Sequence, residues 1–149
     1  MTSPDRVYDI DRRHFLVACA AGACALATTG CASLATHPVA ISNGMVRLTF
    51  ADHPDLARPR GSVRILPTGE RDPVYVLALG DNRFAAVSPI CTHRGCTVEL
   101  HDEHLVCPCH GSTYDRSGAV LRGPAEYPLR RFRVRVEPGV IEIALKEPA

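Results

Sequence analysis

Two short segments of the chain bring together side chains that could bind a metal. Residues 91–96 read Cys-Thr-His-Arg-Gly-Cys, and residues 107–114 read Cys-Pro-Cys-His-Gly-Ser-Thr-Tyr. Each segment therefore places two cysteines and one histidine close together. Thiolate and imidazole groups are the usual protein ligands of zinc and of mixed-ligand iron–sulfur centres. The two segments thus predict a metal or redox centre that is shared between two tight loops.

The distribution of the cysteines limits what these segments can be. Of the seven cysteines, Cys19, Cys24 and Cys31 lie in an apolar N-terminal stretch and the other four lie in the two segments. No further cysteine is left for a disulfide scaffold. A zinc site usually pairs its cysteines on one side and its histidines on the other. Such mixed segments are rare in structural zinc modules and in plain disulfide pairs, which are kept as the non-redox alternatives.

With these segments the chain resembles the Rieske iron–sulfur protein family, and specifically its disulfide-containing, high-potential branch. The resemblance covers residues 40–147 and implies one [2Fe–2S] cluster, in which two thiolates hold one iron and two imidazoles hold the other. The ligands that it assigns are Cys91, His93, Cys107 and His110. Cys96 and Cys109 are left over, one in each loop, and the resemblance implies a disulfide between them.

The ligand set explains why such a centre has a high reduction potential. Two ferric ions, two sulfides and two thiolates sum to zero charge, whereas two more thiolates would leave a doubly negative centre. An electron is added more easily to the neutral centre, so potentials range from roughly −150 to +300 mV. Ser112 and Tyr114 lie where high-potential members of the family place hydroxyl groups against the cluster sulfurs, and such donors raise the potential. A turn residue and a packing aromatic are the alternative roles for these two side chains.

Two further positions follow from the same resemblance. Gly111 allows the chain to turn tightly beside His110. Residues 123–125, Gly-Pro-Ala, resemble the proline-containing loop that covers the cluster in this family, so Pro124 is expected to help keep water away. Taken alone, these three residues would be an ordinary turn.

Residues 1–35 have the pattern of an export segment. Arg12 and Arg13 precede His-Phe-Leu and an uncharged run that continues to Ala35, which resembles the twin-arginine translocation signal. Asp11 and Val17 depart from the residues that are usual beside the arginine pair. Export of a folded domain suits a cluster that is assembled in the reducing cytosol. An ordinary secretory signal, with the arginines as its positive end, is the alternative.

The same segment offers three routes after export. Residues 28–33, Thr-Thr-Gly-Cys-Ala-Ser, resemble a degenerate lipoprotein cleavage site, at which Cys31 would carry lipid. The uncharged run is long enough to remain as a membrane anchor, since about twenty residues span a bilayer, although its Ala, Gly and Thr content makes it a weak one. Cleavage to a soluble periplasmic protein is the third route. The first two routes leave the domain attached to the periplasmic side of the cytoplasmic membrane.

From Ala40 onward the sequence predicts short strands broken by turns, with no helical period. The expected strands are Met45–Phe50, Val63–Leu66, Val74–Leu79, Phe84–Ser88, Thr97–His101, His104–Val106, Arg131–Val136 and Val140–Leu145. We therefore predict an all-β fold, namely a Rieske-type antiparallel sandwich or barrel with a cluster-binding subdomain of two loops. The expected boundaries are a signal or anchor segment over residues 1–35, a linker over residues 36–44 and the Rieske domain over residues 45–147.

These features predict a one-electron carrier that catalyses nothing alone. The first hypothesis is the iron–sulfur subunit of a quinol-oxidising, cytochrome bc-type complex, with cytochromes b and c as partners and quinol as the electron source. The second is a small Rieske subunit or free carrier for another periplasmic enzyme, such as the molybdoenzyme arsenite oxidase. Arg94 favours the second, because the bc-type group commonly has leucine there and a charged tip suits a soluble or peripheral partner. The formal net charge of +1 gives no indication of nucleic-acid binding.

Overall fold

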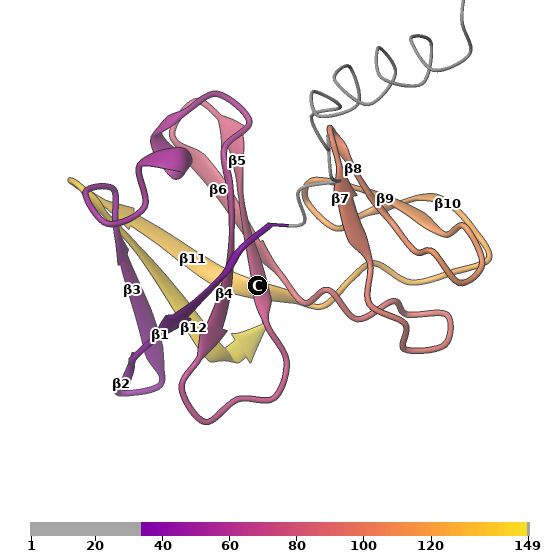
Figure 1. Ribbon diagram of the computed structural model, residues 1–149, viewed down its shortest axis with the longest axis horizontal. Coiled ribbons are helices and arrows are strands. Elements are labelled where there is room, and N and C mark those ends of the chain that lie inside the picture. Colours follow the sequence, from indigo (N-terminus) through magenta and orange to yellow (C-terminus); the bar gives the residue numbers. More distant parts are fainter. Residues whose placement is uncertain (1–33, 149) are drawn as a thin grey trace, which may run out of the picture. The chain divides into compact units, whose positions relative to one another are not determined.

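Short β-strands make up almost all the regular structure of the described chain. The computed structural model describes residues 34–148, which lie in a unit spanning Ser33–Ala149. The strands are β1 (Thr36–Val39), β2 (Ile41–Ser42), β3 (Met45–Thr49), β4 (Ser62–Pro67), β5 (Val74–Gly80), β6 (Arg83–Val87), β7 (Glu99–His101), β8 (His104–Val106), β9 (Thr113–Asp115), β10 (Val120–Arg122), β11 (Arg131–Glu137) and β12 (Val140–Pro148). One turn of 3-10 helix, η1 (Pro54–Ala57), lies between β3 and β4. The predicted all-β class is confirmed for these residues (Figure 1).

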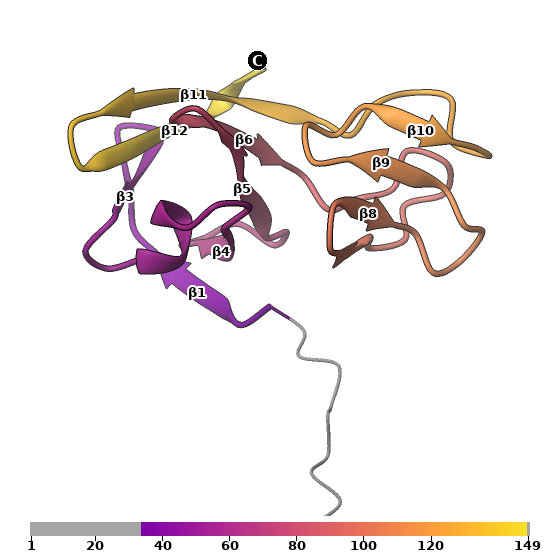
Figure 2. The same cartoon turned by 90° about the horizontal axis from the view of Figure 1, so that it is seen from above.

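Eight of the strands form one large sheet that curls almost into a closed barrel. Their order is β1-β4-β5-β6-β11-β12-β3-β2, so the two edge strands follow one another in the chain with only Ala40 between them. Because one residue joins the two edges, the sheet must bend round on itself, as Figure 2 shows from above. Neighbouring strands are antiparallel apart from β1 and β4, which pair in parallel. The expected antiparallel barrel is present with that one exception.

The large sheet begins earlier in the chain than the sequence analysis predicts. Residues 36–44 were expected to be a linker, but β1 and β2 lie within them and form the two edges of the sheet. Pro38 lies within β1. Proline is disfavoured inside a sheet, but an edge strand tolerates it because one side of that strand is unpaired. Val39 and Ile41 pack against the core. Strands β9 (Thr113–Asp115) and β10 (Val120–Arg122) are not among the predicted strands.

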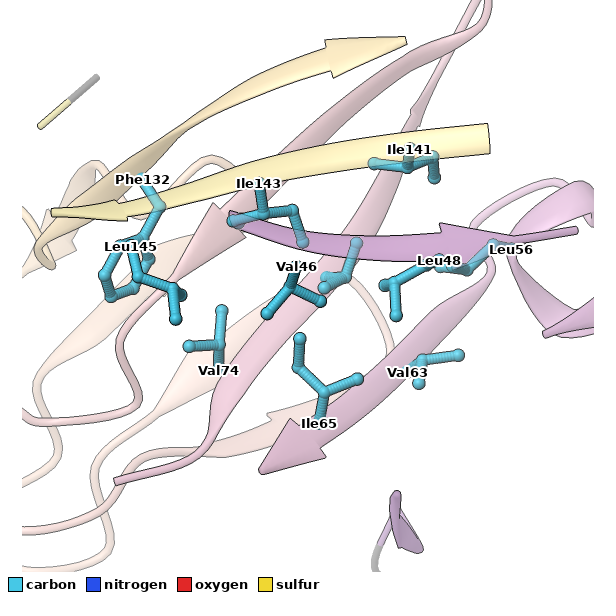
Figure 3. Packing of buried hydrophobic residues seen from close by; sticks show 12 residues of the cluster. Val46, Leu48, Leu56, Val63, Ile65, Val74, Phe132, Ile141, Ile143 and Leu145 are labelled. Atoms are coloured by element: carbon cyan, nitrogen blue, oxygen red, sulfur yellow. The ribbon is translucent and has the colours of Figure 1, made fainter. Parts of the chain in front are cut away.

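Strands β5 and β6 bury both of their faces. Side chains alternate between the faces of a strand, so Val74 and Val76 of β5 belong to the cluster inside the barrel, whereas Tyr75 and Leu77 belong to a second cluster. Figure 3 shows the Val, Leu, Ile and Phe side chains that fill the barrel. The second cluster continues into the small sheet and includes two of the cysteines. The core that supports the candidate site therefore packs on the outer face of β5 and β6.

The remaining four strands form a small sheet in the order β10-β9-β8-β7. A buried arginine, Arg116, lies in the turn between β9 and β10 and connects the small sheet to the large one. Its guanidinium donates hydrogen bonds to the carbonyl oxygens of Arg60, Gly61, Ala78 and Asp102, at 2.8, 2.8, 3.2 and 3.0 Å. Burial lowers the pKa of Arg116, but the guanidinium stays charged because its ordinary pKa is so high. This one side chain thus ties the β9–β10 turn to β5 of the large sheet, to the loop that precedes β4 and to the turn between β7 and β8.

Residues 1–33 lie outside the described part of the chain, and with them the twin-arginine motif, the uncharged run and Cys31. Within residues 34–148, no helix has the length and apolar character that crossing a membrane requires. The predictions about export and anchoring therefore rest on the sequence.

Replacement of Arg116 by methionine is expected to weaken the connection between the two sheets. Four carbonyl acceptors would lose their donor while the new side chain keeps much of the volume, which should cost about 3 kcal/mol. In a domain of this size, that loss should lower the melting temperature by about 10 °C. Thermal unfolding of the purified, cluster-containing protein, followed by circular dichroism, measures the change.

Arg47→Met is the matched control for this variant. Arg47 is exposed, and its 3.1 Å ion pair with Glu142 is on the surface, where such a pair contributes less than about 1 kcal/mol. Equal melting temperatures for the two variants would show that Arg116 does not hold the sheets together.

Candidate metal centre

The structure folds each of the two predicted metal-binding segments into a loop of the small sheet. We call residues 91–96 the first loop and residues 107–112 the second loop. The first loop precedes β7, and the second connects β8 to β9 (Figure 1). Both loops therefore belong to the same four-stranded unit, although ten residues of other structure separate them in the chain.

The two loops are closed in the same way. An antiparallel bridge between Ile90 and Thr97 flanks the first loop. An antiparallel pair between Val106 and Thr113 flanks the second. Each loop therefore spans six residues between two residues that pair with each other, and this pairing fixes both of its ends.

The backbone hydrogen bonds inside the two loops are equivalent as well. In each loop, the N–H of the first residue donates to the carbonyl of the sixth at 2.8 Å, and the N–H of the fifth donates to the carbonyl of the first, at 2.8 and 2.9 Å. The fifth residue is Gly95 in the first loop and Gly111 in the second, with φ of 78° and 75°. Glycine reaches such positive φ without steric cost. Both loops thus make the same tight turn, at Gly111 beside His110 and at Gly95 in its counterpart.

A disulfide between Cys96 and Cys109 joins the two loops, as the family resemblance implied. The sulfur atoms of these two residues and of Cys107 lie within 4.8 Å of one another. Three neighbouring sulfurs suggest a metal site, but two of them are already bonded to each other and offer no thiolate. The grouping therefore marks where the disulfide packs against Cys107.

The other two cysteines keep free thiols, and both are buried. Cys91 and Cys107 are 2% and 1% exposed, and a hydrogen-bond contact brings their side chains together. The two histidines also lie side by side, with the ring centroids of His93 and His110 4.8 Å apart and the rings nearly perpendicular. The four predicted ligands therefore form a thiol pair and an imidazole pair, with one member of each pair from each loop.

This donor set fits a [2Fe–2S] cluster with mixed ligands. Such a cluster takes two thiolates on one iron and two imidazoles on the other, so the four ligands are not expected to converge on a single point. The Nδ1 atom of His93 is buried and has no hydrogen-bond partner. Buried polar atoms normally have a partner, and a ring nitrogen reserved for a metal explains this exception. His110 is exposed, so one edge of the imidazole pair reaches the surface.

Hydrogen-bond donors surround the sulfur of Cys91. Burial raises the pKa of this thiol, but the donors lower it by more, so the pKa lies below its ordinary value. The donors are the Tyr114 hydroxyl, the backbone N–H of His93, the Cys107 thiol and the Ser112 hydroxyl. The Tyr114 hydroxyl lies 3.3 Å from the sulfur. Burial and the contact with Cys91 raise the pKa of Tyr114, so its phenol stays protonated and able to donate.

Thr92 is a part of the site that the sequence analysis missed. Its N–H donates to the Tyr114 hydroxyl oxygen at 3.2 Å, and its own hydroxyl donates to the carbonyl of Tyr127 at 2.6 Å. Because that proton is used on the carbonyl, Thr92 Oγ1 faces Tyr114 as an acceptor, 3.1 Å away. The phenol proton is therefore held between Thr92 and the Cys91 sulfur. The location of Thr92 between two predicted ligands is the signal that could have found it.

The proline-containing segment is attached to both loops. The Ala125 N–H donates to the Ser112 hydroxyl oxygen at 3.0 Å, and the carbonyl of Tyr127 accepts from the first loop. Ala125 is buried, whereas Pro124 is exposed and follows a cis peptide bond. The segment therefore covers Ser112 with Ala125 rather than with the proline ring.

A mixed thiolate and imidazole set on an all-β scaffold defines the class of iron–sulfur proteins in which histidines replace two cysteines on one iron. Residues 50–133 match the Rieske [2Fe-2S] domain, and the chain belongs to this family. Its cofactor is one Rieske-type [2Fe–2S] cluster, and the disulfide between the loops is that of the disulfide-containing branch.

Among curated proteins, the chain is similar to iron–sulfur subunits of the cytochrome b6-f complex. The subunit from Chlorobaculum tepidum is 36% identical over 89 residues, which cover 58% of this chain and 48% of the relative. The subunit from Trichodesmium erythraeum is 40% identical over 86 residues, which cover 54% of this chain and 48% of the relative. The chain thus spans about half the length of the curated relatives it matches.

Solved structures also include similar domains. The plasma membrane Rieske protein PetC3 from Synechocystis PCC 6803 is 34% identical, with a TM-score of 0.53 over 64% of this chain and 93% of that one. A chain in the complex of reduced oxygenase and oxidized ferredoxin in carbazole 1,9a-dioxygenase has a TM-score of 0.55 at 23% identity, over 71% of this chain and 97% of that one. The second likeness shows the fold alone.

Replacement of Tyr114 by phenylalanine is expected to lower the reduction potential. The substitution removes a donor to the Cys91 sulfur, and such a bond should favour the electron-rich reduced state by about 1 kcal/mol, or roughly 40 mV for one electron. A redox titration of the cluster-containing protein, followed by EPR, measures the shift.

Tyr75→Phe is the matched control, because Tyr75 is buried in the same cluster but donates its hydroxyl to the carbonyl of Val98 at 3.2 Å. Its potential should stay at the value of the unmodified protein. A shift of equal size in both variants, or none in Tyr114→Phe, would contradict the donor role.

Proposed function

We propose that Cys91 and Cys107 hold one iron of the cluster and that His93 and His110 hold the other. The observation that carries this assignment is the division of four cysteines into one bonded pair and one free, buried pair. The adjacent imidazole rings and the unpartnered Nδ1 of His93 support it. Because their sulfurs are bonded to each other, the two remaining loop cysteines serve to join the loops.

When bound, the cluster takes up and releases one electron at a time. The residues around it set the conditions for that exchange. Burial of Cys91 and Cys107 keeps water from their sulfurs, and Tyr114 holds a proton toward one of them. His110 is exposed, so we infer that electrons enter and leave through the imidazole edge, because the thiol side is covered by protein.

We infer that the domain carries electrons within a cytochrome bc-type complex. Its relatives are iron–sulfur subunits of the cytochrome b6-f complex, which points to a cytochrome as a partner. We further propose that the electron comes from a quinol. In that setting the chain carries the electron, and it does not transform a substrate alone.

A second candidate is a small Rieske subunit or free carrier for another exported oxidoreductase, such as the molybdoenzyme arsenite oxidase. The observation that favours it is Arg94, which is exposed and adjacent to His93 in the first loop. Inserting this charge into an apolar quinone pocket would require its desolvation, whereas a polar protein surface would not.

We propose that the domain acts on the periplasmic side of the cytoplasmic membrane. The pair Arg12 and Arg13, the uncharged run after it and Cys31 support export followed by membrane attachment. The similarity to a plasma membrane Rieske protein supports the same location. Release as a soluble periplasmic protein is the alternative outcome of export.

The ligand assignment predicts different results for two kinds of cysteine variant. Cys107→Ser should abolish the Rieske-type EPR signal of the reduced protein and lower its iron content. The double variant Cys96→Ala/Cys109→Ala should keep the signal but lose about 3 kcal/mol of stability, because the disulfide closes a loop over a sequence separation of 13. EPR, iron and zinc analysis and thermal unfolding measure these effects.

Two results would contradict the assignment. One is an unchanged signal in Cys107→Ser. The other is an EPR-silent unmodified protein that binds stoichiometric zinc, which would make the domain a structural zinc module.

The export proposal predicts that Arg12→Lys/Arg13→Lys leaves the protein in the cytosol, because the twin-arginine address is read by a receptor. Immunoblots of cytosolic, membrane and periplasmic fractions measure this. Cys31→Ala, with Cys24→Ala as its control, tests lipid attachment by loss of the protein from the membrane fraction. Unchanged export of the twin-lysine variant would favour an ordinary secretory signal instead.

A further inference from the structure

We propose that the surface around His110 docks a protein partner whose own docking face is acidic, and that the electron crosses at this contact. The inference rests on the proposed function, since it takes the imidazole edge as the point of electron exchange. We call the residues of this surface the tip surface. They are Arg94, His110, Leu121, Arg122 and Tyr127.

Hydrogen bonds, strand pairing and chain continuity attach every part of the tip surface to the two loops. Arg94 lies within the first loop and His110 within the second. Arg122, at the end of β10, pairs with Thr113, the residue that follows the second loop. The carbonyl of Tyr127 is held by the Thr92 hydroxyl at 2.6 Å. The backbone that carries these side chains is therefore fixed before a partner arrives, which lowers the entropy lost on binding.

The apolar part of the tip surface is unusual for this domain. Leu121 and Tyr127 are 55% and 68% exposed, and they are two of the three large hydrophobic side chains that are exposed within the described residues. The third, Met45, lies on β3 of the large sheet. Tyrosine and arginine are the residue types that are enriched among the energetically dominant contacts of protein interfaces. The composition of the tip surface therefore suits a protein partner.

The two arginines of the tip surface form no ion pair within the described chain. Several other exposed arginines pair with a carboxylate, namely Arg47, Arg58, Arg60 and Arg83. Neither Arg94 nor Arg122 makes an ion pair with any described residue.

The first loop, the second loop and residues 120–127 together contain two arginines, Arg94 and Arg122. They contain one carboxylate, Glu126. The balance beside the exposed imidazole is thus positive. A partner that places carboxylates around its own redox group would supply the missing charges and be steered to this surface.

The partner that we infer is a protein electron acceptor rather than a lipid surface. Anionic lipid headgroups would also attract arginines and an exposed tyrosine. The tip surface, however, includes the imidazole that we propose as the electron exit, and a membrane placed there would block that exit. The step is a one-electron transfer, in which the reduced domain loses one electron and the ferric haem of the acceptor gains it.

Native and fully succinylated cytochrome c provide a matched pair of probes, because succinylation converts a basic protein into an acidic one. The experiment is stopped-flow oxidation of the reduced, cluster-containing protein by each form, at a series of ionic strengths. We expect the succinylated form to react about tenfold faster at low salt, with a rate that falls as salt is added. This comparison needs no variant, so it is independent of any effect on folding.

Variants then locate the charge. Arg122→Gln and Arg94→Gln/Arg122→Gln should reduce the advantage of the succinylated form in steps of about threefold per charge. Arg71→Gln, in the turn between β4 and β5 of the large sheet, is the control and should leave the rates unchanged. Leu121→Ser/Tyr127→Ser should slow both forms alike, because it removes apolar contact without changing charge.

The outcomes separate this inference from the proposed function. Equal rates with the two cytochromes, or faster transfer to the basic form, in a protein with an intact EPR signal would overturn the acidic-partner proposal alone. Tight binding to phosphatidylglycerol vesicles that blocks oxidation by either form would also overturn it, in favour of a lipid contact. A protein without a Rieske-type EPR signal would overturn the proposed function, and this inference with it.

Discussion

The geometry of the site depends on the closure of two equivalent loops by antiparallel residue pairs. Each loop spans six residues between an antiparallel pair, and each repeats the same two backbone hydrogen bonds. Gly95 and Gly111 take the positive φ that this closure requires. With the backbone fixed in this way, the disulfide needs only to join one loop to the other. The free thiols and the imidazoles then face each other as two pairs from opposite loops.

Two kinds of contact with the barrel hold the small sheet and its loops in place. The first is apolar: Tyr75 and Leu77 of β5 extend the core out of the barrel to the buried cysteines. The second is polar: Arg116 donates to one carbonyl of β5, to two in the loop that precedes β4 and to one in the turn between β7 and β8. A buried charge needs such complete hydrogen bonding to be tolerated. Together these contacts hold the small sheet as an extension of the large one, so the ligands do not depend on the loops alone.

The two sides of the candidate centre differ in their access to water. The thiol side is buried and rich in donors, with Tyr114 and Ser112 fully enclosed. The imidazole side reaches the surface at His110. Burial strengthens the electrostatic effect of each donor on the sulfurs, because the local dielectric constant is low. Exposure on the other side leaves a short path for an electron. The arrangement therefore separates the control of the potential from the contact with a partner.

The two cysteine- and histidine-containing segments, through the family resemblance that they carry, indicated the class of centre and the four candidate ligands, and the short alternating segments predicted the all-β fold. Motif spacing and strand alternation are both local properties of the chain, so the sequence by itself determined these features. Tertiary structure decided what no local pattern carries. Residues 36–44 form the edges of the barrel because Val39 and Ile41 pack against the core. This packing holds although Pro38 lies in one of the edge strands. Thr92 and Arg116 act on the carbonyl groups of distant residues. Every residue has a carbonyl, so these partners leave no signature of residue type, and only the folded chain selects which ones meet.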